Sequence, residues 1–238
     1  MPFGMGGGII LRDGCCAKHK AAIDPFENHV VQKQFGPVRH IHGMPSRNDR
    51  PTHYPGLVKR NGFIRKEDVP LEFFPDILVL PTFTKPPTIL QAREPCELSL
   101  SEVRHYHNAD ANAARLMQFG AEEIIVKPEF RPDFFVRWLA KVAHGVAVAN
   151  YGMEFTPLLL DLIEGGDISG AGYLIGSQVR DMPAPTTAAQ HSVRSDVLYR
   201  DATDGMLVVH LQLFEAEKTP VYSVGVGRPS DALNQTLN

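Results

Sequence analysis

Residues 132–151 carry the pattern that most restricts the fold of this chain. Apolar side chains recur there at the spacing of one helix face, at Phe135, Trp138, Leu139, Val142 and Val146. Pro132 suits the first turn of a helix and Gly152 suits its end. A helix of this kind must bury its apolar face, and we expect it to lie on strands at 76–80 and 206–214.

The distribution of prolines limits the secondary structure that residues 37–95 can form. Ten of the 19 prolines lie between Pro37 and Pro95, which makes a long helix improbable there and favours extended segments and loops. Within this stretch, the apolar run 76–80 predicts a buried strand. At the end of the chain, 206–214 and 221–226 predict an antiparallel hairpin.

The remaining segments predict separate short elements. A capping-box spacing at 99–102 predicts a helix that continues to about Met117, and 122–127 predicts a strand. An apolar helix is expected over 155–164, and a polar connector is expected over 178–204. Because helices and strands do not alternate regularly, we expect a mixed α+β body rather than repeated βαβ units.

Composition excludes a wholly disordered, a collagen-like and a coiled-coil protein. With 43% apolar and 21% charged residues, the chain is typical of a folded globular protein. No apolar run reaches the ~18 residues of a membrane span, and the N-terminus does not resemble a signal peptide. We therefore expect a cytoplasmic protein without membrane contact. Three cysteines, two of them adjacent, favour reduced thiols or a metal ligand over disulfides.

The charges are distributed unevenly. The net charge of −3 combines a balance of +7 over residues 1–66 with a balance of −10 over residues 67–238. A basic segment attracts polyanions, so nucleic-acid contact is expected in the N-terminal part. The alternative is a solvated loop whose lysines and arginines serve solubility alone.

The N-terminus combines three features in order. Glycines at 6–8 precede a short apolar run, the pair Cys16-x-x-His19 follows, and Asp24 to Glu27 resembles a helix start. Cys-x-x-His spacing lets both side chains converge on one tetrahedral zinc, although this is only half of a zinc site. Glu27 is explained by helix capping, since it lies three residues after Asp24.

This order of residues resembles the second half of the finger in bacterial HNH (ββα-metal) endonucleases. The likeness is concentrated in residues 1–40 and extends weakly into the body. In that family, a histidine directly before the motif proline activates water, and cysteine knuckles hold a structural zinc. The resemblance implies structural zinc at Cys16 and His19, DNA as a partner, and a divalent cation such as Mg²⁺ where the whole finger is active.

The sequence departs from the family pattern at its catalytic positions. Met1 stands before the motif Pro2 where the histidine is expected, and Lys20 replaces the expected asparagine. Either the gene start lies further upstream, or the finger has decayed. No general base remains in the motif, so we expect a catalytically incomplete protein with no catalytic residue to assign.

The sequence predicts three segments and leaves three functions open. We expect a partial finger over 1–36, a basic proline-rich connector over 37–66 and an α+β body over 67–238, with the core in the body and the first 36 residues held loosely. The leading function is an HNH-like, nucleic-acid-associated protein. The alternatives are a non-catalytic interaction protein whose body recognises an unknown partner, and an enzyme of another kind. Cationic residues expected to contact phosphate are Lys18, Lys20, Arg39, Arg47, Arg50, Lys59 and Arg60.

The remaining histidines give weaker indications of a metal site. His40 and His42 form an H-x-H pair that would share a face on a strand, although flanking glycines and prolines favour a polar turn. His105 and His107 repeat the pattern inside the helix expected from residue 99, where the two side chains would diverge. His144 is expected on the solvated face of the helix at 132–151.

Overall fold

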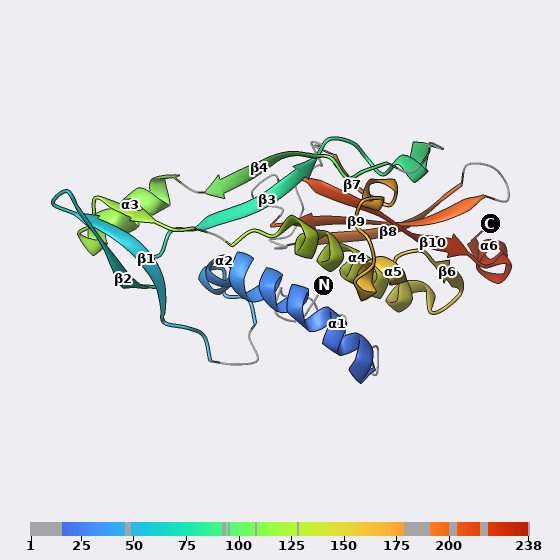
Figure 1. Ribbon diagram of the computed structural model, residues 1–238, viewed down its shortest axis with the longest axis horizontal. Coiled ribbons are helices and arrows are strands. Elements are labelled where there is room, and N and C mark those ends of the chain that lie inside the picture. Colours follow the sequence, from blue (N-terminus) through green and yellow to red (C-terminus); the bar gives the residue numbers. More distant parts are fainter. Residues whose placement is uncertain are drawn as a thin grey trace.

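The computed structural model describes residues 16–45, 49–91, 94, 96–107, 109–127, 129–178, 191–199, 204–214 and 219–237. The molecule is elongated, with a small sheet at one end and a larger sheet covered by helices at the other (Figure 1). Helices and antiparallel strands are both abundant, which confirms the α+β class.

The larger sheet is formed by the C-terminal strands. Its order is β6-β10-β9-β8, with β7 also paired to β10, and every pairing is antiparallel. Neighbouring strands β9 and β10 confirm the predicted C-terminal hairpin. The strands are β6 (Phe155–Pro157), β7 (Ile175–Gln178), β8 (His191–Tyr199), β9 (Gly205–Leu213) and β10 (Val221–Pro229).

Helix α4 (Pro132–Tyr151) has the predicted bounds and lies on this sheet. It packs against β8, β9 and β10, so the expected contact with 206–214 is confirmed. Leu78 and Leu80 of the predicted strand belong to the same buried cluster. The buried residues of α4 extend beyond the predicted stripe to Val136, Ala140 and Ala143, so the helix is covered on more than one side.

The second side of α4 is covered by the N-terminal helices. They are α1 (Ala17–Asn28), a π-helical stretch (His29–Gln34) and α2 (Gly36–Ile41). Phe35 is fully buried, and its ring centroid lies 5.8 Å from that of Trp138 and 5.8 Å from that of Phe214. The expectation that the core begins near residue 67 is therefore wrong, because Phe26, Val30 and Phe35 belong to it.

Helix α1 begins seven residues before the predicted start at Asp24, and Pro25 lies inside it. A proline within a helix costs about 3 kcal/mol, and burial of Ile23 and Phe26 against the core offsets this cost. The capping role expected for Glu27 is also wrong. Its Oε2 lies 2.6 Å from Nζ of Lys141 on α4, and this ion pair joins the two helices.

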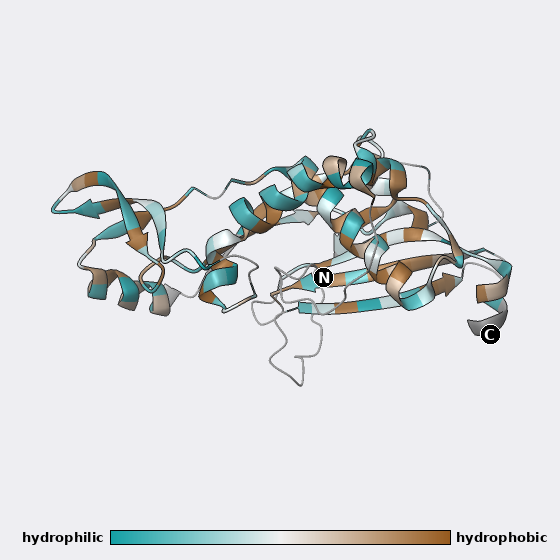
Figure 2. Cartoon of the chain, turned by 90° about the horizontal axis from the view of Figure 1, so that it is seen from below, coloured by the Kyte–Doolittle hydropathy of each residue, from teal (hydrophilic) through white to brown (hydrophobic). Residues whose placement is uncertain are grey.

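The small sheet has the order β2-β1-β5 and one helix, α3, packed on it (Figure 2). Strands β1 and β2 meet at a tight turn in which Asn61 and Gly62 both have positive φ, as a type I′ hairpin requires. The core of this part consists of Val58, Val69, Phe74 and Ile124. The elements are β1 (His53–Arg60), β2 (Phe63–Pro70), α3 (Ala109–Phe119) and β5 (Glu123–Ile125), the last confirming the strand predicted there.

Strands β3 (Ile77–Phe83) and β4 (Leu100–His107) form a ribbon between the two ends. Strand β3 confirms the prediction at 76–80. The helix predicted from residue 99 is wrong in its first half, because β4 pairs with the buried strand β3 along its length. Burial and pairing outweigh the local capping signal here, and the helix begins only at Ala109.

Two segments that were expected to be a helix and a connector contain strands of the large sheet. Only Leu160–Glu164 of the apolar segment 155–164 is helical (α5), since its beginning is the strand β6 that pairs with β10. The connector expected over 178–204 contains β8, which pairs with β9. The remaining short helices are η3 (Thr88–Gln91), η4 (Ala171–Tyr173) and α6 (Asp231–Leu237).

The position of Phe35 leads to a stability prediction. Phe35→Ala should lower the free energy of unfolding by about 3–5 kcal/mol, because it opens a cavity between α4 and β9. Urea unfolding of the full chain measures this change. Gln32→Ala, at an exposed position one turn earlier, should change stability by less than about 0.5 kcal/mol. Equal, small effects of both substitutions would show that the N-terminal helices are not part of the core.

Candidate functional site

Cys16, His19 and Glu164 meet where α1 begins. Sγ of Cys16 lies 3.1 Å from Nδ1 of His19, one helical turn further along. Nε2 of the same ring lies 3.0 Å from Oε1 of Glu164, the last residue of α5. The sequence predicts the first two residues by their spacing, but nothing in it indicates Glu164, which is brought there by the packing of α1 on α5.

This geometry suits a metal-binding pair. A histidine that binds a metal commonly donates its second ring N–H to a carboxylate, which orients the ring. Glu164 has this position, so Nδ1 of His19 and the Cys16 thiol are the two groups that face each other as ligands. In the described parts of the chain, no three His, Cys, Asp or Glu side chains are placed together to hold a metal ion. The residues present fit half of a zinc site.

The other candidate ligands near the N-terminus are engaged elsewhere or not described. Cys15 lies outside the described residues. His29 donates from Nε2 to the carbonyl oxygen of Glu129 at 2.9 Å. His42 lies 3.0 Å from the Asp76 carboxylate. Neither histidine is next to the pair of Cys16 and His19.

Lys18 and Lys20 flank His19 in the first turns of α1, and both are exposed. Their ammonium groups stand at the end of the helix where the macrodipole is positive. Among the predicted phosphate contacts, these two are the ones that lie beside Cys16 and His19.

The other predicted phosphate contacts lie apart from α1. Arg50 is exposed and donates to the carbonyl oxygen of Gly43 at 2.8 Å, and Arg47 lies outside the described residues. Arg39 is only 1% exposed, which rules out the expected contact at the surface. Its Nη2 donates to the carbonyl oxygen of Pro45 at 3.0 Å, and burial lowers the pKa of its guanidinium.

His40 is buried beside Arg39 on α2, so the expected polar turn is wrong for His40, whereas His42 lies in the turn that follows α2. Nδ1 of His40 lies 2.5 Å from the Tyr54 hydroxyl. Burial, with smaller contributions from the charges of Arg39 and Arg50, lowers the pKa of His40 to about 4. The ring is therefore neutral at pH 7.

Two further histidine expectations are resolved by the fold. His144 is partly buried rather than solvated, its ring meets that of Phe155 edge to face, and burial lowers its pKa. His105 and His107 lie on the strand β4 instead of a helix, and their side chains lie outside the described part of the structure.

The hairpin of β1 and β2 presents different cations from those predicted. Lys59 lies 3.8 Å from the Glu122 carboxylate, and Arg60 lies 2.5 Å from Glu67, so both predicted residues are ion-paired. Arg65 and Lys66 on β2 are exposed, and neither has an ion-pair partner within the described residues. Neither was predicted from the sequence, although their place after the Asn-Gly turn was a usable signal. Exposed apolar side chains precede them, Phe63 (70% exposed) and Ile64 (54%).

Comparison of the chain with known protein families, with curated proteins and with solved structures found no match. Within the described residues, no helix has the length and apolar character needed to cross a membrane.

His40 gives a pH-dependent prediction. Its pKa is lower in the folded chain than the usual 6.5, so between pH 6.5 and pH 4 the unfolded chain binds a proton that the folded chain does not. The free energy of unfolding should fall by up to about 3 kcal/mol over this window. Urea unfolding at several pH values measures the fall.

His40→Gln should flatten this profile in part, because glutamine does not titrate. Part of the slope should remain, since the pKa of His144 is lowered in the same direction. An unchanged profile in the His40→Gln variant would contradict the assignment.

Proposed function

We propose that this chain is an HNH-like, nucleic-acid-associated protein that binds phosphate backbones and does not cleave them. The observation that carries the proposal is the arrangement at the start of α1. There Lys18 and Lys20 stand on either side of a histidine whose ring lies between a thiol and the carboxylate of Glu164. A metal held at Cys16 and His19 would fix this turn. Because Lys18 and Lys20 lie two residues apart on α1, they project to different sides of the helix and would contact different phosphates of one backbone.

The lack of cleavage follows from the motif residues. General-base catalysis needs a proton acceptor within hydrogen-bond reach of the attacking water. In the family this acceptor is a histidine that an asparagine of the motif orients, and Lys20 stands at the position of that asparagine here. The role of the bound metal in this proposal is to stabilise the N-terminal turn.

Zinc binding tests the metal-binding half of the proposal. Titrated with zinc, the purified chain should take up one ion per molecule, measured by isothermal titration calorimetry, and Cys16→Ala should lose this binding. Glu164→Gln should weaken zinc binding about 10- to 100-fold, because it removes the carboxylate that orients His19.

Cys96→Ala is the matched control, since this thiol contacts Thr88 away from α1. It should still bind zinc. Failure of the unaltered chain to take up zinc would contradict metal binding at this site, and so would equal loss in the two cysteine variants.

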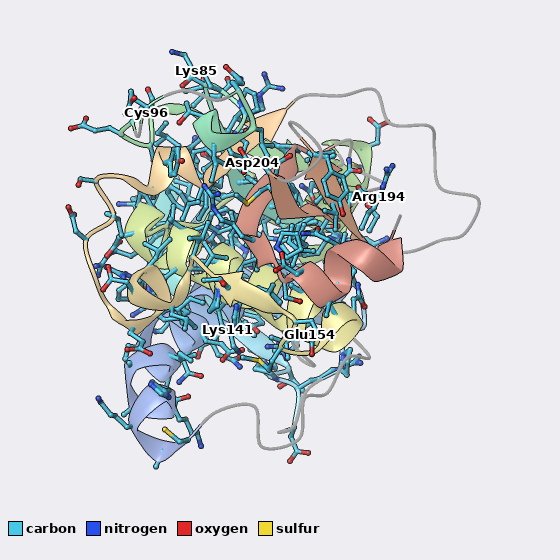
Figure 3. All side chains as sticks on the ribbon, turned by 90° about the vertical axis from the view of Figure 1, so that its right-hand side faces the viewer. Lys85, Cys96, Lys141, Glu154, Arg194 and Asp204 are labelled. Atoms are coloured by element: carbon cyan, nitrogen blue, oxygen red, sulfur yellow. The ribbon has the colours of Figure 1, made fainter. Side chains whose placement is uncertain are left out.

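DNA binding tests the other half. Without the buried Arg39 and the ion-paired Lys59 and Arg60, four of the predicted cations remain, Lys18, Lys20, Arg47 and Arg50. Four phosphate contacts predict that log affinity for a duplex falls with log salt at a slope of about −4. The double variant Lys18→Ala/Lys20→Ala should make the slope shallower by about two units. Lys85→Ala is the control, because this exposed lysine lies at the opposite edge of the molecule from α1 (Figure 3).

Plasmid DNA should stay uncut with Mg²⁺. No binding at low salt, or cutting that depends on residues 16–42, would contradict the proposal.

The β1–β2 hairpin favours the second candidate function, a non-catalytic interaction protein. Phe63 and Ile64 expose apolar surface beside Arg65 and Lys66. An aromatic and an aliphatic side chain next to two cations would suit a protein partner with an acidic rim. Binding to DNA that depends on Lys18 and Lys20 alone would leave this hairpin free for such a partner.

A further inference from the structure

Three buried nitrogen atoms on neighbouring residues of α2 have no hydrogen-bond partner. They are Nε and Nη1 of Arg39 and Nε2 of His40. Buried polar groups are nearly always hydrogen-bonded, and each exception calls for an explanation. Other unpartnered atoms of the described residues occur on single side chains, whereas here three occur on two adjacent residues.

Two of the three atoms are hydrogen-bond donors in any state, because arginine nitrogens carry protons and accept no hydrogen bonds. Nδ1 of His40 lies 2.5 Å from the Tyr54 hydroxyl. In the tautomer in which this hydroxyl donates to Nδ1, the ring proton is on Nε2, which makes Nε2 the third donor. A group that satisfies all three must therefore be an acceptor.

The charge around these donors is uncompensated. Arg39 is 1% exposed, and within the described residues its side chain donates one hydrogen bond, to the carbonyl oxygen of Pro45, which is neutral. No carboxylate forms an ion pair with it among the described residues. Burial lowers the pKa of the Arg39 guanidinium, Tyr54 raises it, and the like charge of Arg50 lowers it. The charge of Arg50 also lowers the pKa of His40, after burial and the charge of Arg39. A buried cation beside a second cation is costly unless an anion accompanies them.

We propose that Arg39, His40 and Arg50 form a binding site for a small tetrahedral oxyanion of the phosphate class. Nη1 of the Arg39 guanidinium and the imidazole N–H of His40 would each donate to an oxygen of such an ion, and the ion's charge would balance the buried cation. Because Arg39 and His40 are buried, the occupant must be a small ion enclosed with them. A nucleic-acid backbone that runs along the surface does not reach these two side chains. This site is independent of the proposed contacts of Lys18 and Lys20 with nucleic acid.

The contacts of the two arginines suggest what the ion does. Arg39 and Arg50 donate to three consecutive carbonyl oxygens, those of Gly43, Met44 and Pro45. An anion between the guanidinium groups would remove their mutual repulsion and hold this turn after α2. Binding of the ion would thereby stabilise the folded state.

Thermal unfolding in inorganic phosphate, compared with sodium chloride at equal ionic strength, tests the site. Saturating phosphate should raise the Tm of the unaltered chain by roughly 5–10 °C, since an ion that binds only the folded state stabilises it by mass action. Isothermal titration calorimetry should find one phosphate per chain. Phosphate also stabilises proteins without a site, and the variants measure that general part.

Arg39→Met should lose the specific part of the shift and the calorimetric signal. The apolar side chain has a similar volume, so this variant should fold, and without phosphate it should be at least as stable as the original. Arg50→Met, at an exposed position, should still fold and weaken phosphate binding at least tenfold. Arg65→Met on β2 is the matched control and should respond as the original chain does.

Two results would overturn the proposal. One is an equal phosphate response in the original chain and the Arg39→Met variant, which would mean that water satisfies the three nitrogens. The other is competition in which duplex DNA displaces phosphate from the original chain and does so equally in the variant Lys18→Ala/Lys20→Ala. That result would assign the site to a backbone phosphate instead of a free ion.

Discussion

The burial of helix α4 on both sides is the constraint on which the rest of the structure depends. One side lies on β8, β9 and β10, and the other is covered by α1 and the π-helical stretch. Phe35 joins the two layers, since its ring meets those of Phe135, Trp138 and Phe214 edge to face. A helix with apolar residues on so much of its surface is stable in water only when both sides are covered. The N-terminal helices are therefore part of the core.

This packing also determines where the candidate sites lie. Because α1 lies against α4 and α5, its first turn comes next to Glu164, and the spacing of Cys16 and His19 gains a carboxylate on the second ring nitrogen. The ion pair of Glu27 and Lys141 holds α1 in the same position. Further along, α2 is buried deeply enough to enclose Arg39 and His40. Both the proposed metal-binding pair and the proposed oxyanion site thus depend on the attachment of the N-terminal helices to α4.

The elements that the sequence predicts well are those whose local pattern agrees with their burial. The helix at 132–151 and the hairpin of β9 and β10 are of this kind, because their apolar spacing matches the faces that become buried. The failures occur where distant contacts outweigh a local signal. Asp24 and Pro25 resemble a helix start, yet burial of Phe26 extends the helix through them. Ser99 and Glu102 resemble a helix cap, yet pairing with β3 makes the segment a strand.

The candidate sites were predictable only in part, for a related reason. Spacing within one helical turn brings Cys16 and His19 together, and this is a local property. The position of Glu164 next to His19 depends on how α5 packs against α1, and no local sequence pattern predicts this packing. Counting positive charges treats all cations as equal and cannot tell that Arg39 is buried while Arg65 is exposed. Burial decides which cations are available to a polyanion at the surface, and it is a property of the folded chain.

Native-state hydrogen exchange tests the joint core of the N-terminal helices and α4 most directly. If these elements form one core, backbone amides of residues 26–40 should exchange with the same free energy of opening as those of residues 135–147. That free energy should equal the one for global unfolding of the chain. Exchange at residues 26–40 that is faster by two or more orders of magnitude would contradict a single core. It would show that the N-terminal helices open while α4 remains folded on the sheet.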